Sequence, residues 1–219
     1  MCGRYYLADV KSLKERFNLK DVAEWLNSRY NIAPSQEVPG IVEDDGRRLV
    51  RFKWGLIPHW AKKPGTGLIN ARSETADVKP SFRHSFKKQR CLLPASGFYE
   101  WKKEGGKKLP FCMGLASREP FAFAGLWSTY QSTGGERIET CAILTTSANG
   151  LVARIHERMP VILPREAEDL WLDPRVTDSG LLKRVLKPFP EDLMSLHRVS
   201  TLVNSPRNQG PSLLDPLDE

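Results

Sequence analysis

The chain has 219 residues, of which 40% are hydrophobic, with 16 glycines, 16 prolines, a net charge of +7 and a pI of about 9.3. This composition excludes a disordered or fibrous chain and predicts a single globular domain over residues 1–219. Because no apolar run approaches the ~20 residues of a membrane span and no secretory signal pattern is present, we expect an intracellular, cytoplasmic protein with no membrane partner. The positive charge is typical of proteins with a polyanionic partner, although ordinary basic enzymes share it.

The first distinctive feature in chain order is the cysteine at position 2. A small side chain after Met1 favours removal of that methionine, which leaves Cys2 with a free α-amine and a thiol on adjacent carbons. An α-amine is less basic than a lysine amine and forms an imine with an aldehyde, onto which the thiol closes as a thiazolidine. A small residue also follows Met in many chains by chance.

The first half of the chain predicts short helical segments around one β-hairpin. Helical turns are expected over residues 9–17, with Asp9 as the cap, and over residues 21–26 and 79–86. Two extended runs, residues 37–42 and 48–57, flank the turn at residues 44–46 and predict the hairpin. A loop over residues 62–67, rich in Lys, Pro and Gly, leads to residues 68–72.

The second half of the chain predicts mostly strands. They are expected over residues 91–94, 98–103, 109–115, 121–127, 140–146 and 159–163, with Gly-rich turns at 104–106 and 133–135. Helices are expected over residues 149–155, 165–172 and 179–186, and loop after residue 204. Strands in series with irregularly placed helices predict an α+β fold with a largely antiparallel, barrel-like β core and short flanking helices.

Three of the four cysteines lie in apolar, strand-like runs. Cys91, Cys112 and Cys141 are therefore expected to be reduced core residues. The sequence has no C-x-x-C spacing and no paired histidines, so we expect no metal site and no cofactor. His59, His84 and His197 are expected at the surface.

Three polar residues are candidates for the chemistry that an aminothiol site requires. Glu100, between Tyr99 and Trp101, is a carboxylate in an apolar setting suited to proton transfer, or a strand residue in a salt bridge. His156 follows a predicted helix and suits proton shuttling, or caps the helix end. Asn70 has an amide that can hold an amine or a sugar oxygen, or is a turn residue.

Basic and aromatic residues lie in or beside the same segments. Single-stranded nucleic acid binding needs cations that track phosphates and aromatic faces on which bases stack. The candidate cations are Arg4, Arg72, Arg83 and Arg158. The candidate aromatic residues are Trp54, Trp60 and Trp101, of which one or two are expected to be exposed, since most tryptophans are core residues.

Taken together, these segments resemble the SOS-response-associated peptidase (SRAP) family of abasic-site processing proteins. The resemblance runs in order through nearly the whole chain. It is carried by Met1-Cys2-Gly3-Arg4, Tyr30-Asn31-Ile32-Ala33-Pro34, Trp54-Gly55-Leu56-Ile57-Pro58, Ile69-Asn70-Ala71-Arg72-Ser73-Glu74-Thr75, Gly97-Phe98-Tyr99-Glu100-Trp101, Ile155-His156-Glu157-Arg158-Met159-Pro160 and Val203-Asn204-Ser205-Pro206-Arg207-Asn208.

The resemblance implies a specific activity: binding of abasic sites in single-stranded DNA and a covalent thiazolidine crosslink to the ring-opened deoxyribose. It implies Cys2 as nucleophile, Glu100 as acid/base, Asn70 as positioning amide and His156 as proton shuttle. The implied DNA contacts are Arg4, Trp60, Arg72, Trp101, Thr145 and Arg158. It further implies a self-cleaving peptidase activity that releases Met1, lyase-like chemistry, and a monomer that in a bacterium acts at the nucleoid.

One departure from the family pattern concerns DNA geometry. Many members have two adjacent tryptophans after the Trp-Gly-x-x-Pro segment, whereas here Trp60 is followed by Ala61. A stacking or wedging contact is therefore expected to be missing, which affects DNA geometry and affinity and not the chemistry.

Two other classes of function remain open. An N-terminal-nucleophile cysteine amidohydrolase or peptidase also begins Met-Cys-Gly and uses its α-amine as a base. A non-covalent single-stranded DNA-binding module is the other alternative, with Cys2 incidental.

Overall fold

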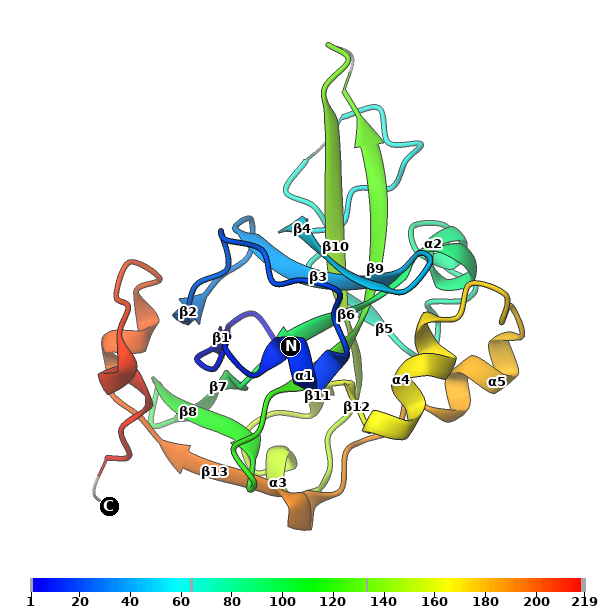
Figure 1. Ribbon diagram of the computed structural model, residues 1–219. Coiled ribbons are helices and arrows are strands. Elements are labelled where there is room, and N and C mark those ends of the chain that lie inside the picture. The colour runs from blue at the N-terminus through cyan, green and yellow to red at the C-terminus, as the bar shows by residue number, and fades with distance from the viewer. Residues whose placement is uncertain (1, 64, 133, 218–219) are drawn as a thin grey trace.

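A computed structural model describes residues 2–63, 65–132 and 134–217 (Figure 1). The expected removal of Met1, part of the turn expected at residues 133–135 and part of the loop expected at residues 62–67 lie outside the described residues. The chain forms two sheets with short helices at their edges.

Five strands close into a barrel. Pairing runs from β3 to β4, β10, β9 and β6 and back to β3, antiparallel except between β4 and β10. The strands are β3 (Glu37–Glu43), β4 (Arg47–Trp54), β6 (Arg90–Ala95), β9 (Phe121–Gln131) and β10 (Arg137–Ser147). The expected α+β class with a largely antiparallel, barrel-like core is confirmed.

The burial pattern of β9 explains where the barrel ends. Its first six residues are all buried, as in a strand covered on both faces, whereas from Trp127 onward buried and partly exposed residues alternate. The C-terminal half of β9 and the N-terminal half of β10 therefore project from the rest of the protein as a two-stranded ribbon (Figure 1).

A second sheet packs against the barrel in the order β13-β8-β7-β1-β2, all antiparallel. Its strands are β1 (Tyr5–Leu7), β2 (Arg29–Ile32), β7 (Gly97–Glu104), β8 (Lys107–Leu115) and β13 (Met194–Arg198). Tyr5 of β1 contacts Trp54 and Phe123 of the barrel edge-on, with ring centroids 5.4 and 5.7 Å away. Both sheets therefore share one hydrophobic core.

Three short strands extend the barrel sheet. They are β5 (Asn70–Arg72), which runs parallel to β10, β11 (Arg158–Pro160), which pairs with β10, and β12 (Ile162–Leu163), which pairs with β9. The single strand expected over residues 159–163 is divided because Val161 bridges two strands. Its N–H donates to Leu144 of β10 and its carbonyl accepts from Ala124 of β9.

The helices are short and lie at the sheet edges. They are α1 (Leu13–Phe17), α2 (Arg83–Lys88), α3 (Gly150–Ala153), α4 (Arg165–Leu172) and α5 (Ser179–Arg184), with 3₁₀ turns at Glu191–Leu193, Thr201–Asn204 and Pro211–Leu214. Within the described ranges, no helix is both long enough and apolar enough to cross a bilayer.

The prediction of a helix over residues 21–26 was wrong. Its side chains are held by tertiary contacts instead: Trp25 lies under the Arg51 guanidinium at 4.5 Å, and Leu26 is buried. The helix expected over residues 9–17 begins only at Leu13, because Asp9 accepts a hydrogen bond from the Ser12 N–H in the preceding turn. Strands β1, β2 and β13 were not predicted, and the tail expected to be loop contains a 3₁₀ turn.

A buried carboxylate joins helix α4 to the start of the chain. Glu168 has a side chain only 2% exposed and accepts from Arg16 at 2.7 Å and from Arg47 at 3.1 Å. The neighbouring Asp169 also contacts Arg47, but its side chain is 89% exposed. Two guanidinium groups therefore share one buried countercharge.

We expect Glu168→Gln to lower the free energy of unfolding by about 3 kcal/mol, because it leaves two largely buried guanidinium groups without their shared charge. Asp169→Asn, on the same helix, should cost about 1 kcal/mol or less, since exposed pairs contribute little. Urea denaturation followed by circular dichroism measures both. Equal, small effects would contradict the buried network.

Candidate active site

Cys2 lies just ahead of β1 and is fully buried. β1 pairs antiparallel with β7, and the Tyr99 N–H donates to the Arg4 carbonyl at 2.9 Å. Continuing this register brings Cys2 beside the part of β7 that carries Glu100. The Cys2 Sγ lies 3.9 Å from the Arg4 carbonyl oxygen. The side chain with the most reactive chemistry is thus held inside the protein against a carboxylate.

The surroundings of Cys2 keep its thiol protonated. Burial raises the pKa of the Cys2 thiol well above its ordinary value, and the negative charge of Glu100 raises it further. A thiolate is the stronger nucleophile, so the resting thiol must give up its proton as the sulfur attacks. Glu100 is only 5% exposed, and its carboxylate is the charged group that raises the pKa of the Cys2 thiol.

Asn70 holds the backbone of the cysteine. It is the first residue of β5, opposite Ile143 of β10, and its Nδ2 donates to the Cys2 carbonyl at 2.9 Å. The Oδ1 atom of the same amide is buried and has no hydrogen-bond partner among the described residues. The amide therefore keeps an acceptor available close to the start of the chain.

A pocket of about 410 Å³ brings four of the predicted residues together. Arg4, Glu100, Trp101 and His156 line it, although they lie as far as 152 positions apart. Three further lining residues were not predicted from sequence, namely Lys103, Lys108 and Asn204. Basic groups surround the carboxylate and the imidazole, so the pocket suits an anionic ligand that undergoes proton transfer.

His156 is held through its Nδ1 atom by the backbone of Arg158. The Arg158 N–H donates to Nδ1 at 2.9 Å, and the Arg158 carbonyl oxygen lies 3.2 Å from the same atom. The shorter contact favours the tautomer with its proton on Nε2. The ring is half-buried at the pocket wall, where a proton on Nε2 can be donated to a ligand oxygen.

Arg4 is oriented by contacts from distant segments. Its Nη1 donates to the Asn31 Oδ1 and to the Val203 carbonyl, both at 2.7 Å. The guanidinium lies 5.6 Å from the centre of the Trp101 ring, and the Trp101 Nε1 donates to the Asn204 Oδ1 at 2.7 Å. Partial burial lowers the pKa of Arg4, yet a guanidinium stays charged at neutral pH. A cation and an aromatic ring are thus fixed side by side.

Asn31 is a buried organising residue that sequence reasoning did not identify. Besides accepting from Arg4, it donates through Nδ2 to the carbonyls of Val203, Ser205 and Asn208 at 2.9–3.2 Å. It therefore ties the C-terminal segment to the pocket. The available signal was an amide inside an otherwise apolar strand segment, where a buried polar side chain needs partners.

Thr145 and Arg158, both expected to contact DNA, are held within the protein. Thr145 is fully buried in β10, and its contact with DNA stays a prediction. The Arg158 side chain is 12% exposed and donates to both carboxylate oxygens of Glu74, at 2.6 and 2.9 Å, and to the Thr145 carbonyl at 2.7 Å. These hydrogen bonds lower the pKa of Glu74. Arg158 is therefore engaged within the protein.

The loop before β5 carries the most exposed aromatic residue of the predicted set. Trp60 is 56% exposed, whereas Trp54 is buried with its Nε1 donating to the Ile69 carbonyl. The loop is closed by paired hydrogen bonds between Leu56 and Leu68 at 2.9 Å. These hydrogen bonds bring Gly55 and Gly67 into contact. Gly67 has a φ of +72°, and a Cβ atom at this position would overlap the Gly55 carbonyl.

Arg72 and Arg83 are also exposed, so they are free to meet an external ligand. Trp60, Arg72 and Arg83 lie outside the group of residues that lines the small pocket. His59 and His84 are exposed as expected, with ring centroids 5.0 Å apart. His197 is instead half-buried against the Leu214 carbonyl.

The remaining cysteines behave as expected for core residues. Cys91, Cys112 and Cys141 are buried free thiols. In the described part of the chain, no three His, Cys, Asp or Glu side chains are grouped as metal ligands.

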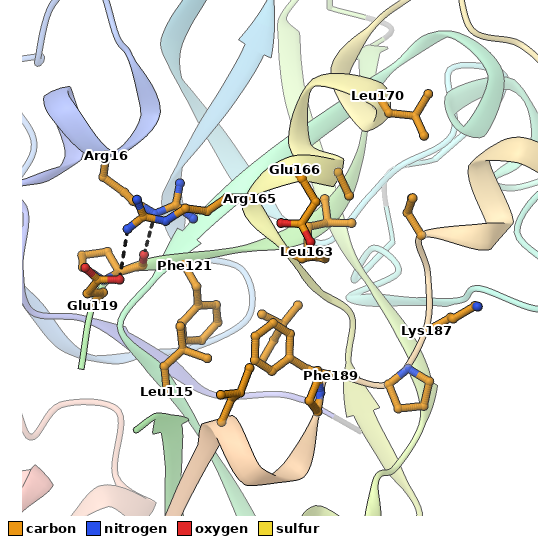
Figure 2. Close-up of a pocket in the computed structure, with 18 of the residues that line it drawn as sticks. Arg16, Leu115, Glu119, Phe121, Leu163, Arg165, Glu166, Leu170, Lys187 and Phe189 are labelled. Carbon is orange, nitrogen blue, oxygen red and sulfur yellow. Dashed lines mark hydrogen bonds and ion pairs between the residues drawn. The ribbon is translucent and has the colours of Figure 1, made fainter. Parts of the chain in front are cut away.

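A larger pocket of about 640 Å³ lies elsewhere, beside α4 and the segment that follows α5 (Figure 2). Leu115, Phe121 and Phe189 form its apolar floor, and an ion pair between Arg165 and Glu119 at 3.0 Å closes one side. It contains none of the residues predicted to carry chemistry. The smaller polar pocket is therefore the candidate active site.

Comparison with known proteins gives a consistent family assignment. The model of the family described as SOS response associated peptidase (SRAP) matches residues 1–206. Abasic site processing protein YoqW of Bacillus subtilis (strain 168) is 44% identical over 223 residues, covering 98% of this chain and 99% of the relative. Abasic site processing protein YedK of Escherichia coli (strain K12) is 32% identical over 225 residues, covering 99% and 100%.

Solved structures agree with the sequence comparisons. A protein from Bacteroides thetaiotaomicron superimposes with a TM-score of 0.88 at 28% identity, covering 99% of this chain and 100% of that one. A protein from Bordetella bronchiseptica gives a TM-score of 0.78 at 29% identity, covering 91% and 100%.

We expect the thiols of the native chain to resist modification. Burial raises the pKa of all four, that of Cys112 to about 12, so thiolate is scarce at pH 8. Ellman's reagent should react at least ~10²-fold more slowly than with the chain in denaturant. Since the unfolded thiols titrate near pH 8.5, the free energy of unfolding should fall as the pH rises above that value. A thiol that reacts in the native chain at the denatured rate would contradict the burial of all four cysteines.

Proposed function

The chain belongs to the SOS response associated peptidase (SRAP) family, and we propose that it binds abasic sites in single-stranded DNA and crosslinks to them through Cys2. Two relatives that match it over nearly their full lengths are named abasic site processing proteins. The observation that carries the proposal is a basic pocket lined by Glu100 and His156, together with the buried Cys2 thiol that the Glu100 charge acts on and whose carbonyl Asn70 holds.

The reaction joins an aminothiol and an aldehyde with loss of one water. After Met1 is removed, the α-amine of Cys2 adds to C1′ of the ring-opened deoxyribose and gives a carbinolamine. Loss of its hydroxyl as water forms the imine. The Cys2 sulfur then bonds to the imine carbon while the thiol proton passes to the nitrogen, which closes the thiazolidine.

The residues around Cys2 have separate tasks in this sequence. Glu100 accepts the proton of the amine or the thiol as each attacks, because it is the carboxylate whose charge acts on Cys2. His156 donates its Nε2 proton to the departing hydroxyl. Asn70 fixes the Cys2 carbonyl with Nδ2 and leaves Oδ1 to accept from the α-amine.

DNA binding is assigned to groups that remain available to a ligand. Arg72 contacts phosphates, and Trp60 and Trp101 offer faces on which bases stack. Arg4 lies against Trp101 at the pocket, where its charge faces the abasic nucleotide. Arg158 acts as a positioning residue through Glu74, and Trp60 stacks without the second tryptophan that many members carry.

Release of Met1 is a further part of the proposal, because the α-amine of Cys2 exists only after it. The family description includes a peptidase, and the same nucleophile and base suit attack on a peptide carbonyl. A cysteine amidohydrolase would use them on glutamine, and ammonia release from glutamine is the measurement that would favour that alternative.

We expect Cys2→Ala to abolish the heat-stable crosslink to an abasic oligonucleotide and to leave reversible binding largely intact. Affinity should come from phosphate contacts and stacking rather than from the covalent residue. Denaturing electrophoresis measures the crosslink and fluorescence anisotropy measures binding. A stable crosslink formed by the variant would reject the thiazolidine mechanism. If the wild-type protein forms no stable crosslink, the result would favour a non-covalent DNA-binding module.

We expect Glu100→Gln and His156→Ala each to slow crosslink formation or its reversal by about 10² or more, the scale of a lost general acid or base. Glu104→Gln, on the same strand, and His59→Ala, an exposed imidazole, are matched controls that should react at the wild-type rate. Single-turnover time courses provide the rates, and thermal unfolding confirms that the variants fold. Wild-type rates for Glu100→Gln would return it to a structural role.

A further inference from the structure

The β7–β8 hairpin places two lysines at the mouth of the candidate active site. Lys103 and Lys108 are exposed and line the same pocket as Glu100 and His156. They stand directly opposite each other in the antiparallel register of the two strands. Two ammonium groups are therefore presented from adjacent strands toward one space.

This arrangement carries an electrostatic cost in the protein alone. Like charges directly opposite on an antiparallel pair repel and destabilise the hairpin. The next pair toward the turn is Glu104 opposite Lys107, and Lys102 contacts Glu104 at 3.0 Å. Within the described ranges, neither Lys103 nor Lys108 forms an ion pair. An anion bound between the two lysines would remove the repulsion.

The neighbouring residue on the same face identifies the kind of anion. Trp101 precedes Lys103 by two residues, so the two side chains share a face about 6.8 Å apart along the strand. The Trp101 ring is fixed by Asn204 and lies against Arg4. An aromatic face followed at this spacing by paired cations suits a nucleotide whose base stacks and whose phosphate lies further along the strand.

We propose that Lys103 and Lys108 together bind one backbone phosphate of the DNA strand that leaves the pocket along the β7–β8 hairpin, next to the abasic nucleotide. This assignment rests on the proposed function. It gives the strand a defined exit direction, from Trp101 toward the hairpin turn.

The test uses the full chain and oligonucleotides that contain a tetrahydrofuran abasic analogue, which lacks an aldehyde and reports binding alone. The double variant Lys103→Gln/Lys108→Gln should bind on the order of 10-fold more weakly at low salt. A plot of the logarithm of its binding constant against the logarithm of salt concentration should be less steep by about 0.7, the value for one single-strand phosphate. Replacing one phosphate beside the abasic analogue with a neutral methylphosphonate should weaken binding by the wild-type protein as much as the double mutation does. The same replacement should not weaken binding by the double variant any further.

The control is Lys102→Gln/Lys107→Gln, which removes the same charge from the same hairpin but from the opposite face of its strands. For this control variant, methylphosphonate substitution should weaken binding at every position as much as it does for the wild-type protein. If the Lys103/Lys108 variant behaves like this control, the assignment is overturned. Crosslinking of authentic abasic DNA by the wild-type protein is measured in parallel. If no crosslink forms, the proposed function is overturned. If the crosslink forms but no phosphate position distinguishes the wild-type protein from the double variant, only the lysine site is overturned.

Discussion

The pairing of β1 with β7 is the constraint on which the candidate site depends. The Tyr99 N–H donates to the Arg4 carbonyl, which fixes where the first residues of the chain lie relative to Glu100. Tyr5 anchors the strand in the core through edge-on contacts with Trp54 and Phe123. A chain start usually frays, because few contacts hold it. Here it is built into the sheet, so the side chain at position 2 has a defined environment.

The positive charge of the chain divides into two populations with different roles. Arg90 is buried and donates to five backbone carbonyls that join α2, α4 and the following loop, and Arg16 is neutralised by Glu168. These groups hold the fold together and cannot meet a ligand. Arg72, Lys103 and Lys108 are exposed and are available to phosphates. The net charge of +7 therefore overstates the surface that DNA can use.

The sequence predicted the barrel strands and the strands β7 and β8 of the second sheet well, but it missed the other three strands of that sheet. The hairpin over residues 37–57 and the central strands carry long apolar or alternating runs separated by glycine turns. By contrast, β1, β2 and β13 have three to five residues each, and β1 pairs with a strand about ninety residues away. Strands this short are determined by their partners rather than by local pattern.

The same distinction applies to the site. Glu100, His156 and Asn70 were predicted because their residue types suit the chemistry of Cys2. Asn31 and Asn204 were missed, since their roles arise from hydrogen bonds between segments more than one hundred residues apart. Sequence spacing does not encode such contacts. The sequence likewise did not indicate that Thr145 is buried or that Arg158 pairs with Glu74.

The most direct test of the central claim is the covalent structure of the crosslink itself. The complex with abasic DNA is digested with nuclease and trypsin, alkylated with iodoacetamide and analysed by mass spectrometry. The account predicts that the deoxyribose adduct lies on the peptide from Cys2 to Arg4, without Met1, and that its thiol is blocked from alkylation because the sulfur is part of the ring. An adduct on a lysine, or on a peptide that retains Met1 and an alkylated Cys2, would contradict the account.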